Sequence, residues 1–152
     1  YKSIIMFEKL KGIFDKKIEE KNEKFDTIQI AISTLMIQTA VYDGVFDEKE
    51  KSAILGLIKK YFNLSEDEKI SLFEMAMKVN DDSNDMQQFT RVLNDNLSEK
   101  EKLSIVEMLW KIIIADGHID DYENALIRKI SGLLYISDKD IGRIKKKLVT
   151  QE

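Results

Sequence analysis

Two strongly apolar stretches constrain the fold of this chain most. They cover residues 28–41 and 103–115, and each carries apolar residues around much of the circumference of a helix. A helix that is apolar on most sides lies buried among other helices. Each stretch is followed by an Asp-Gly pair, at residues 43–44 and 116–117, where glycine permits the turn that ends a helix. The sequence therefore predicts two central helices, each followed by a sharp corner.

The rest of the sequence also favours helices. It contains no proline, and no segment shows the strict alternation of apolar and polar residues that is typical of strands. Several expected helix starts pair a capping residue with an acidic residue three positions later, a pattern that satisfies free N–H groups of the first turn. These pairs are Asp47 with Glu50, Ser65 with Glu68, Ser98 with Glu101, Asp120 with Glu123, and Ser137 with Asp140. Three of the helices are predicted over residues 47–62, 65–79 and 83–94.

The two parts of the chain also resemble each other. The matching positions are Asp43, Gly44, Asp47 and Glu50 with Asp116, Gly117, Asp120 and Glu123 and, after a slip of one residue, Ile58, Phe62, Leu64 and Ser65 with Ile130, Leu134, Ile136 and Ser137. We therefore predict an all-α single domain of about seven to eight helices, in two pseudo-two-fold-related halves around two buried core helices. This domain covers residues 26–152, with the repeat at about 27–80 and 98–148. Residues 1–25 are predicted to form an amphipathic N-terminal helix and a charged linker.

Composition excludes several classes of function. The 24 basic and 28 acidic residues give a net charge of -4, which argues against a nucleic-acid-binding protein. The absence of cysteine excludes thiolate metal sites and thiol redox chemistry. The sequence has no Gly-x-Ser-x-Gly elbow, no glycine-rich phosphate loop and no pair of histidines for zinc. We therefore expect a protein that is not an enzyme.

No stretch approaches the roughly 20 apolar residues that span a bilayer. We expect a cytoplasmic protein, placed at the inner face of the membrane if its first helix binds lipid. That amphipathic helix, or a segment outside this sequence, is the only route to a membrane that we expect. Other proteins are the expected partners, and the sequence leaves their identity and the oligomeric state open.

Both corners carry the box Asp-Gly-x-apolar-Asp-acid-x-Glu. It matches the second half of an EF-hand loop, in which the final glutamate would be Glu123 in the second copy. The first two ligand positions would be Thr39 and Val41 in the first copy, and Ile112 and Ile114 in the second. Apolar side chains do not coordinate Ca²⁺, so neither corner is an EF-hand.

Two interpretations of the box remain. In the first, Asp47 and Asp120 only cap helices, and the glutamates only complete the caps. In the second, the boxes also hold a divalent cation, which would be Ca²⁺, Mg²⁺, Mn²⁺ or Zn²⁺. Acids such as Asp43 and Asp116 are disfavoured at the partially negative end of a helix. Carboxylates roughly 5 Å apart would repel by about 3 kcal/mol per pair at an effective dielectric constant of 20, a cost that a cation would remove.

Four residues beside the boxes bear on the second interpretation. His118, the only histidine of the sequence, and Asp121 lie in or beside the second box and are candidate additional site residues, although His118 also fits a plain exposed turn. Lys49 and Lys51 flank the first box, where their charge would neutralise it. The second box is therefore favoured as the stronger site.

The paired boxes, YDGVFDEKE and ADGHIDDYE, each closing a buried helix, resemble those of the TerB family of tellurite-resistance B-like domains. The resemblance covers roughly residues 27–148. It implies an all-helical domain with pseudo-two-fold halves and a cluster of acidic residues suspected of binding metal ions. By motif match, the implied metal ligands are Asp43, Asp47, Glu50, Asp116, Asp120 and Glu123.

The same resemblance implies a role in a stress or tellurite resistance response. A chain without cysteine does not reduce tellurite through thiols, so metal-ion sensing is the form of that role that we expect. The alternative is a protein-interaction module of the co-chaperone or scaffold type that has no metal site. Related domains occur fused to J-domains of membrane-anchored co-chaperones.

Four aromatic residues are predicted to lie in the core. They stand at helical spacing with aliphatic residues, which is typical of a buried helix face. They are Tyr61, Phe62, Trp110 and Tyr135.

Overall fold

The computed structural model describes residues 25–40, 48–82, 85–115 and 121–150, and the predicted N-terminal helix lies outside them. The elements in the described part are seven helices, which confirms the prediction of an all-α domain. None of these helices is both long and apolar enough to cross a membrane. They are α2 (Thr27–Ala40), α3 (Glu48–Phe62), α4 (Glu66–Asp82), α5 (Met86–Asn96), α6 (Glu99–Ile114), α7 (Asp121–Leu133) and α8 (Asp138–Thr150).

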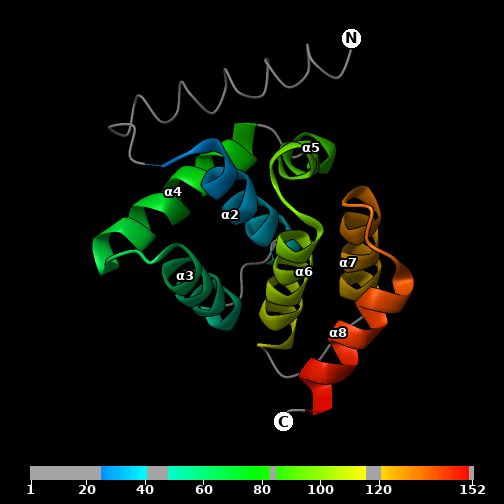
Figure 1. Ribbon diagram of the computed structural model, residues 1–152. Helices are drawn as coiled ribbons and strands as arrows, with labels where there is room; N and C mark the ends of the chain where they lie inside the picture. Colours follow the sequence, from blue (N-terminus) through cyan, green and yellow to red (C-terminus); the bar gives the residue numbers. More distant parts are fainter. Residues whose placement is uncertain (1–24, 41–47, 83–84, 116–120, 151–152) are drawn as a thin grey trace.

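The two apolar stretches form the central helices α2 and α6, as predicted. Helix α2 packs against α3, α4, α5, α6 and α7, and α6 packs against α2, α3, α7 and α8 (Figure 1). Every residue from Ile30 to Ala40 is buried. The buried residues of α6 include Leu109 and Trp110, and all of them are apolar. The core therefore lies around the contact between these two helices.

The remaining helices pack in a reciprocal pattern. Helices α3 and α4 pack on α2 and on each other, and α7 and α8 do the same on α6. Helix α3 also contacts α6, and α7 contacts α2. Exchanging α2, α3 and α4 with α6, α7 and α8 therefore reproduces these contacts. Helix α5 breaks the pattern, because it packs on α2 and α7 and has no counterpart among the described helices.

Helices α4 and α6 begin with the predicted capping boxes. The N–H of Ser65 donates to Glu68 Oε1 at 3.0 Å, and the N–H of Glu68 donates to Ser65 Oγ at 3.2 Å. Ser98 and Glu101 make the same two bonds at the start of α6, at 2.9 and 3.2 Å. Hydrogen bonds to Ser98 lower the pKa of the Glu101 carboxyl. A good cap contributes about 1 kcal/mol, so these serines fix where the helices start.

Helices α3 and α7 end in the same way. A residue with a positive φ follows each helix: Asn63 directly after α3, at 55°, and Tyr135 two residues after the end of α7, at 61°. In each case the next N–H donates to a carbonyl five residues back, which satisfies an otherwise free carbonyl of the last turn. These bonds join Leu64 to Lys59 and Ile136 to Ser131, each at 2.9 Å.

Two predicted helix boundaries were wrong by a few residues. Helix α4 continues to Asp82, and α5 begins at Met86 rather than at residue 83. The reason is the position of the cap. Asp85 Oδ1 accepts a hydrogen bond from the N–H of Gln87 at 3.0 Å, so Asp85 is the residue that starts α5.

The aromatic residues were predicted to lie in the core, and this is wrong for two of them. Trp110 is buried and Phe62 is half-buried. Tyr61 is 40% exposed and Tyr135 is 79% exposed. Tyr135 follows the last turn of α7 in the left-handed region, so it does not continue the buried face of that helix.

Candidate functional site

The acidic boxes follow the C-terminal ends of α2 and α6. Of the predicted metal ligands, the structure describes Glu50, in the first turn of α3, and Glu123, in the first turn of α7. Among the residues that are described, no three Asp, Glu, His or Cys side chains gather closely enough to hold a metal ion. Asp121, a candidate additional site residue, is also described. The remaining predicted site residues lie outside the described ranges: they are Asp43, Asp47, Asp116, Asp120 and His118.

The two described glutamates differ in burial. Glu50 is 7% exposed, whereas Glu123 is half-buried. Their neighbours Glu48 and Asp121 are exposed. Burying a carboxyl group costs free energy unless the surrounding groups compensate for the lost hydration. The first corner therefore buries a carboxyl group that is only half-buried in the second.

Gln38 is a second buried polar group at the first corner. It lies in the last turn of α2, is 7% exposed, and has no hydrogen-bond partner for Oε1 or for Nε2. By contrast, the hydroxyl of Thr34 donates to the carbonyl of Ile30 at 2.7 Å, and that of Thr39 donates to the carbonyl of Leu35 at 2.9 Å. A buried polar group without a partner costs about 1–3 kcal/mol. Gln38 thus has an amide oxygen without a hydrogen-bond partner in the last turn of α2.

Gln38 was not among the site residues predicted from the sequence. The available signal was a large polar residue in residues 30–40, which otherwise hold only apolar residues, serine and threonine. Its match in the second half is Lys111, which is exposed and lies 3.9 Å from Glu107. The buried amide is therefore a feature of the first half.

Lys51 has a structural partner of its own. Its ammonium group lies 5.6 Å from the centre of the Phe73 ring on α4, a distance typical of a cation–π contact. Lys49 is exposed. The ammonium group of Lys51 is therefore positioned against α4.

The sequence matches the family model of the tellurite resistance protein TerB over residues 29–146. The chain belongs to the TerB family. This confirms the resemblance that the paired boxes indicated. No curated protein matches the sequence.

The fold of this TerB-family chain has a counterpart among solved structures. It is similar to the crystal structure of a protein of unknown function from Porphyromonas gingivalis W83, with a TM-score of 0.59. The two sequences are 23% identical, and the similarity covers 80% of this chain and 97% of the other. At this level of identity the likeness concerns the fold.

Two described residues on either side of the first box carry oxygen donors. Gln38, in the last turn of α2, and Glu50, in the first turn of α3, flank the first box in the sequence, and these two helices pack together. Carboxylate and amide oxygens are ligands of Ca²⁺, Mg²⁺ and Mn²⁺. The residues on both sides of this corner thus have the chemistry that a hard cation requires.

Proposed function

We propose that this TerB-family chain is a non-enzymatic domain that binds a divalent cation at its acidic corners, in a stress response of the tellurite-resistance type. The observation that carries the proposal is the pair of buried polar groups at the first corner, Glu50 and Gln38. Burial of an amide without a hydrogen-bond partner costs free energy. A cation bound by the amide oxygen of Gln38 would offset this cost, and the carboxyl group of Glu50 would add a charged oxygen ligand.

The first corner is the stronger site in this proposal, which reverses the preference drawn from the sequence. Three observations support the reversal. Glu50 is more deeply buried than Glu123, and the buried amide of Gln38 is replaced by the exposed Lys111 in the second half. Lys51, whose charge argued against the first corner, lies over Phe73. Coulombic attraction is stronger in a buried site because water screens it less.

The chemistry of the proposed ligands also narrows the choice of cation. All proposed ligands donate through oxygen, and the chain has no cysteine. Zn²⁺ sites in proteins are built mostly from sulfur and imidazole ligands, whereas Ca²⁺, Mg²⁺ and Mn²⁺ take oxygen. We therefore expect one of the latter three ions to bind most tightly.

Binding would link the cation to the stability of the fold. An ion bound only by the native state stabilises it by about 2.7 kcal/mol when its concentration is a hundred times its dissociation constant. The gain would tie the end of α2 to the start of α3. A change in cation concentration would then change how firmly this corner holds the two helices together.

Isothermal titration calorimetry of the full chain with Ca²⁺, Mg²⁺, Mn²⁺ and Zn²⁺ tests the proposal. We expect saturable binding of a hard cation, a loss of at least about tenfold in affinity in Glu50→Gln, and a smaller loss in Glu123→Gln. The control is Glu99→Gln, which removes an exposed carboxylate from the first turn of α6 and should bind as the parent does. A parent protein that binds none of the four ions would end the proposal. Equal binding by Glu50→Gln and the parent would remove Glu50 from it.

A further inference from the structure

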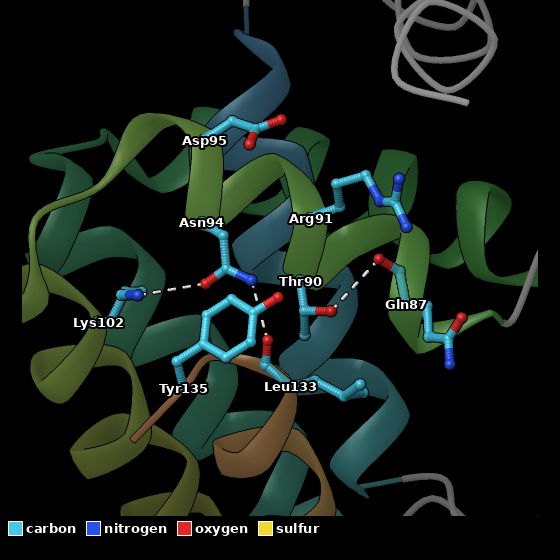
Figure 2. A pocket seen from close by; sticks show the side chains of 8 residues that line it. All are labelled: Gln87, Thr90, Arg91, Asn94, Asp95, Lys102, Leu133 and Tyr135. Atoms are coloured by element: carbon cyan, nitrogen blue, oxygen red, sulfur yellow. Dashed lines mark hydrogen bonds between the residues drawn. The ribbon is translucent and has the colours of Figure 1, made fainter. Parts of the chain in front are cut away.

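A pocket of about 540 Å³ lies where α5, the start of α6 and the turn between α7 and α8 meet (Figure 2). Most of the residues that line it are polar or charged, and none belongs to the acidic boxes. It is formed largely by α5, the helix without a counterpart in the other half. The pocket is therefore not part of the packing pattern that the two halves share.

Asn94 holds the base of this pocket in place. Its Nδ2 donates to the backbone carbonyl of Leu133 at 2.8 Å, which joins α5 to the end of α7. Its Oδ1 accepts from Lys102 Nζ at 3.2 Å, which joins α5 to α6. The same ammonium group lies 5.7 Å from the centre of the Tyr135 ring. Three elements are thus connected around the pocket, so its shape exists before anything binds.

Tyr135 is an unusual residue for its backbone position. The left-handed region disfavours bulky side chains, and glycine or asparagine normally occupies the residue after such a helix end. The first half follows that rule with Asn63, at a φ of 55°, whereas the second half places a tyrosine at 61°. The ring is 79% exposed, so burial does not compensate the strain. Strained residues of this kind concentrate at functional sites.

The charges around the pocket favour an acidic ligand. In Figure 2, Lys102 and Arg91 lie on either side of the pair formed by Asn94 and Tyr135. Within the described residues, the guanidinium group of Arg91 has no ion pair. Asp95 is the acidic residue of the lining, and it stands above Asn94 in this view, away from Tyr135. Two cationic side chains thus line the pocket, and one of them, Lys102, contacts the exposed ring of Tyr135.

We propose that this pocket binds an acidic peptide segment of a partner protein. Tyr135 packs against the segment, and Arg91 and Lys102 receive its carboxylates. Tyrosine and arginine are the residue types that most often dominate protein–protein interfaces. Pockets for small molecules are lined mainly by apolar groups, whereas this one is open and mostly polar, which favours a peptide over a free small anion. The proposal does not depend on cation binding.

Amide chemical shifts of ¹⁵N-labelled full-length protein, followed during titration with a blocked hexaglutamate peptide in EDTA at low salt, test this proposal. We expect saturable shifts in α5, at the start of α6 and at Tyr135 and Ile136. Tyr135→Asn should lower the affinity at least about fivefold. The midpoint of thermal unfolding of Tyr135→Asn should equal that of the parent or exceed it by roughly 2 °C, because asparagine suits the left-handed position. A purely structural role for the ring would instead lower the midpoint.

Matched controls separate this site from general charge effects. Tyr122→Asn removes another exposed tyrosine, 69% exposed on α7, and should bind as the parent does. Arg91→Gln should weaken binding, whereas Arg128→Gln, on the exposed face of α7, should not. Absence of shifts, equal loss in the controls, or unchanged binding by Tyr135→Asn would overturn the proposal. Glutarate or inorganic phosphate binding as tightly as the peptide would overturn the assignment to a peptide, because the ligand would then be a free small anion.

Discussion

The first half of the molecule, α2 to α4, and the second, α6 to α8, share one packing plan but carry their polar groups in different places. Helix α2 buries Ser33, Thr34, Gln38 and Thr39, whereas the buried residues of α6 are all apolar. The second half instead exposes an aromatic ring at the turn after α7. The shared plan accounts for the packing of six of the seven described helices, and α5 stands outside it. Both of our functional proposals rest on polar groups that differ between the two halves.

The largest expected effect is the loss of unfolding free energy when a core residue of either half is replaced by alanine. These variants test whether the two halves unfold together. Ile37 and Trp110 occupy matching, fully buried positions of α2 and α6. Replacement of either by alanine should cost about 2–5 kcal/mol of unfolding free energy, at the upper end for the tryptophan. Because α3 contacts α6 and α7 contacts α2, both variants should still unfold in a single transition.

Urea unfolding followed by far-ultraviolet circular dichroism measures this prediction. If Ile37→Ala unfolded in two separate steps while Trp110→Ala did not, the halves would be independent units. The molecule would then consist of two small domains rather than one domain with a shared core.

The second prediction concerns the buried amide of the first half. Gln38→Leu should raise the unfolding free energy of the cation-free protein by about 1 kcal/mol, because it removes a buried polar group without a partner. The same variant should bind the cation more weakly. Lys111→Leu, at the matching exposed position, should change stability by less than about 0.5 kcal/mol. The measurement is chemical denaturation with and without EDTA, and a destabilised Gln38→Leu would show that the amide has a partner that supports the fold.

The third prediction exchanges the two helix ends. Asn63→Tyr should destabilise the protein by about 1 kcal/mol, because a bulky side chain is disfavoured in the left-handed region. The unfolding free energy of Asn63→Gly should stay within a few tenths of a kcal/mol of the parent value, since glycine adopts this conformation freely. Thermal unfolding of the two variants side by side provides the test. Equal stability of Asn63→Tyr and the parent would remove the strain argument for Tyr135.

The smallest effect concerns a surface ion pair of the first half. Glu66 accepts hydrogen bonds from Lys59 and, at 2.8 Å, from Lys69, and these contacts lower the pKa of its carboxyl to about 2. A lowered pKa means that the ion pairs stabilise the folded state above the ordinary pKa of 4.5, and that this contribution is lost as the pH falls toward about 2. At the corresponding turn of the second half, the described residues include an ion pair between Arg128 Nη1 and Asp138 Oδ1, which lie 3.7 Å apart.

Carbon-detected NMR titration of the Glu66 carboxyl measures its pKa directly. Lys59→Gln should move the pKa of Glu66 upward, since the hydrogen bond from Lys59 is the largest cause of the shift. A midpoint near 4.5 in the parent would show that the two lysines do not hold the carboxylate in solution.

Much of the fold could be predicted because it follows from local patterns. The apolar runs identified α2 and α6, and Ser65 and Ser98 marked helix starts because their side chains satisfy free N–H groups. Tyr135 was misplaced for a physical reason. Helical spacing assumes that the helix continues, whereas α7 ends at Leu133 and the chain then turns into the left-handed region.

The candidate site could be predicted only in part. The acids of the boxes are visible in the sequence because they recur, but their burial depends on packing between helices that lie apart in the chain. Gln38 was missed because it stands beside Thr39 and four residues after Thr34, among polar residues of α2 that give no periodic signal of a site. Its burial and its lack of a partner emerge only when the surrounding helices are in place.

Paramagnetic broadening by substoichiometric Mn²⁺, recorded on the amide signals of the ¹⁵N-labelled chain, tests the central claim most directly. Mn²⁺ takes oxygen ligands and broadens signals only near the bound ion. The account predicts the strongest broadening at the end of α2 and at the start of α3, around Gln38 and Glu50, with sharp signals at Tyr135. Broadening spread evenly over exposed carboxylates such as Glu66 and Asp82, or confined to another surface, would contradict it.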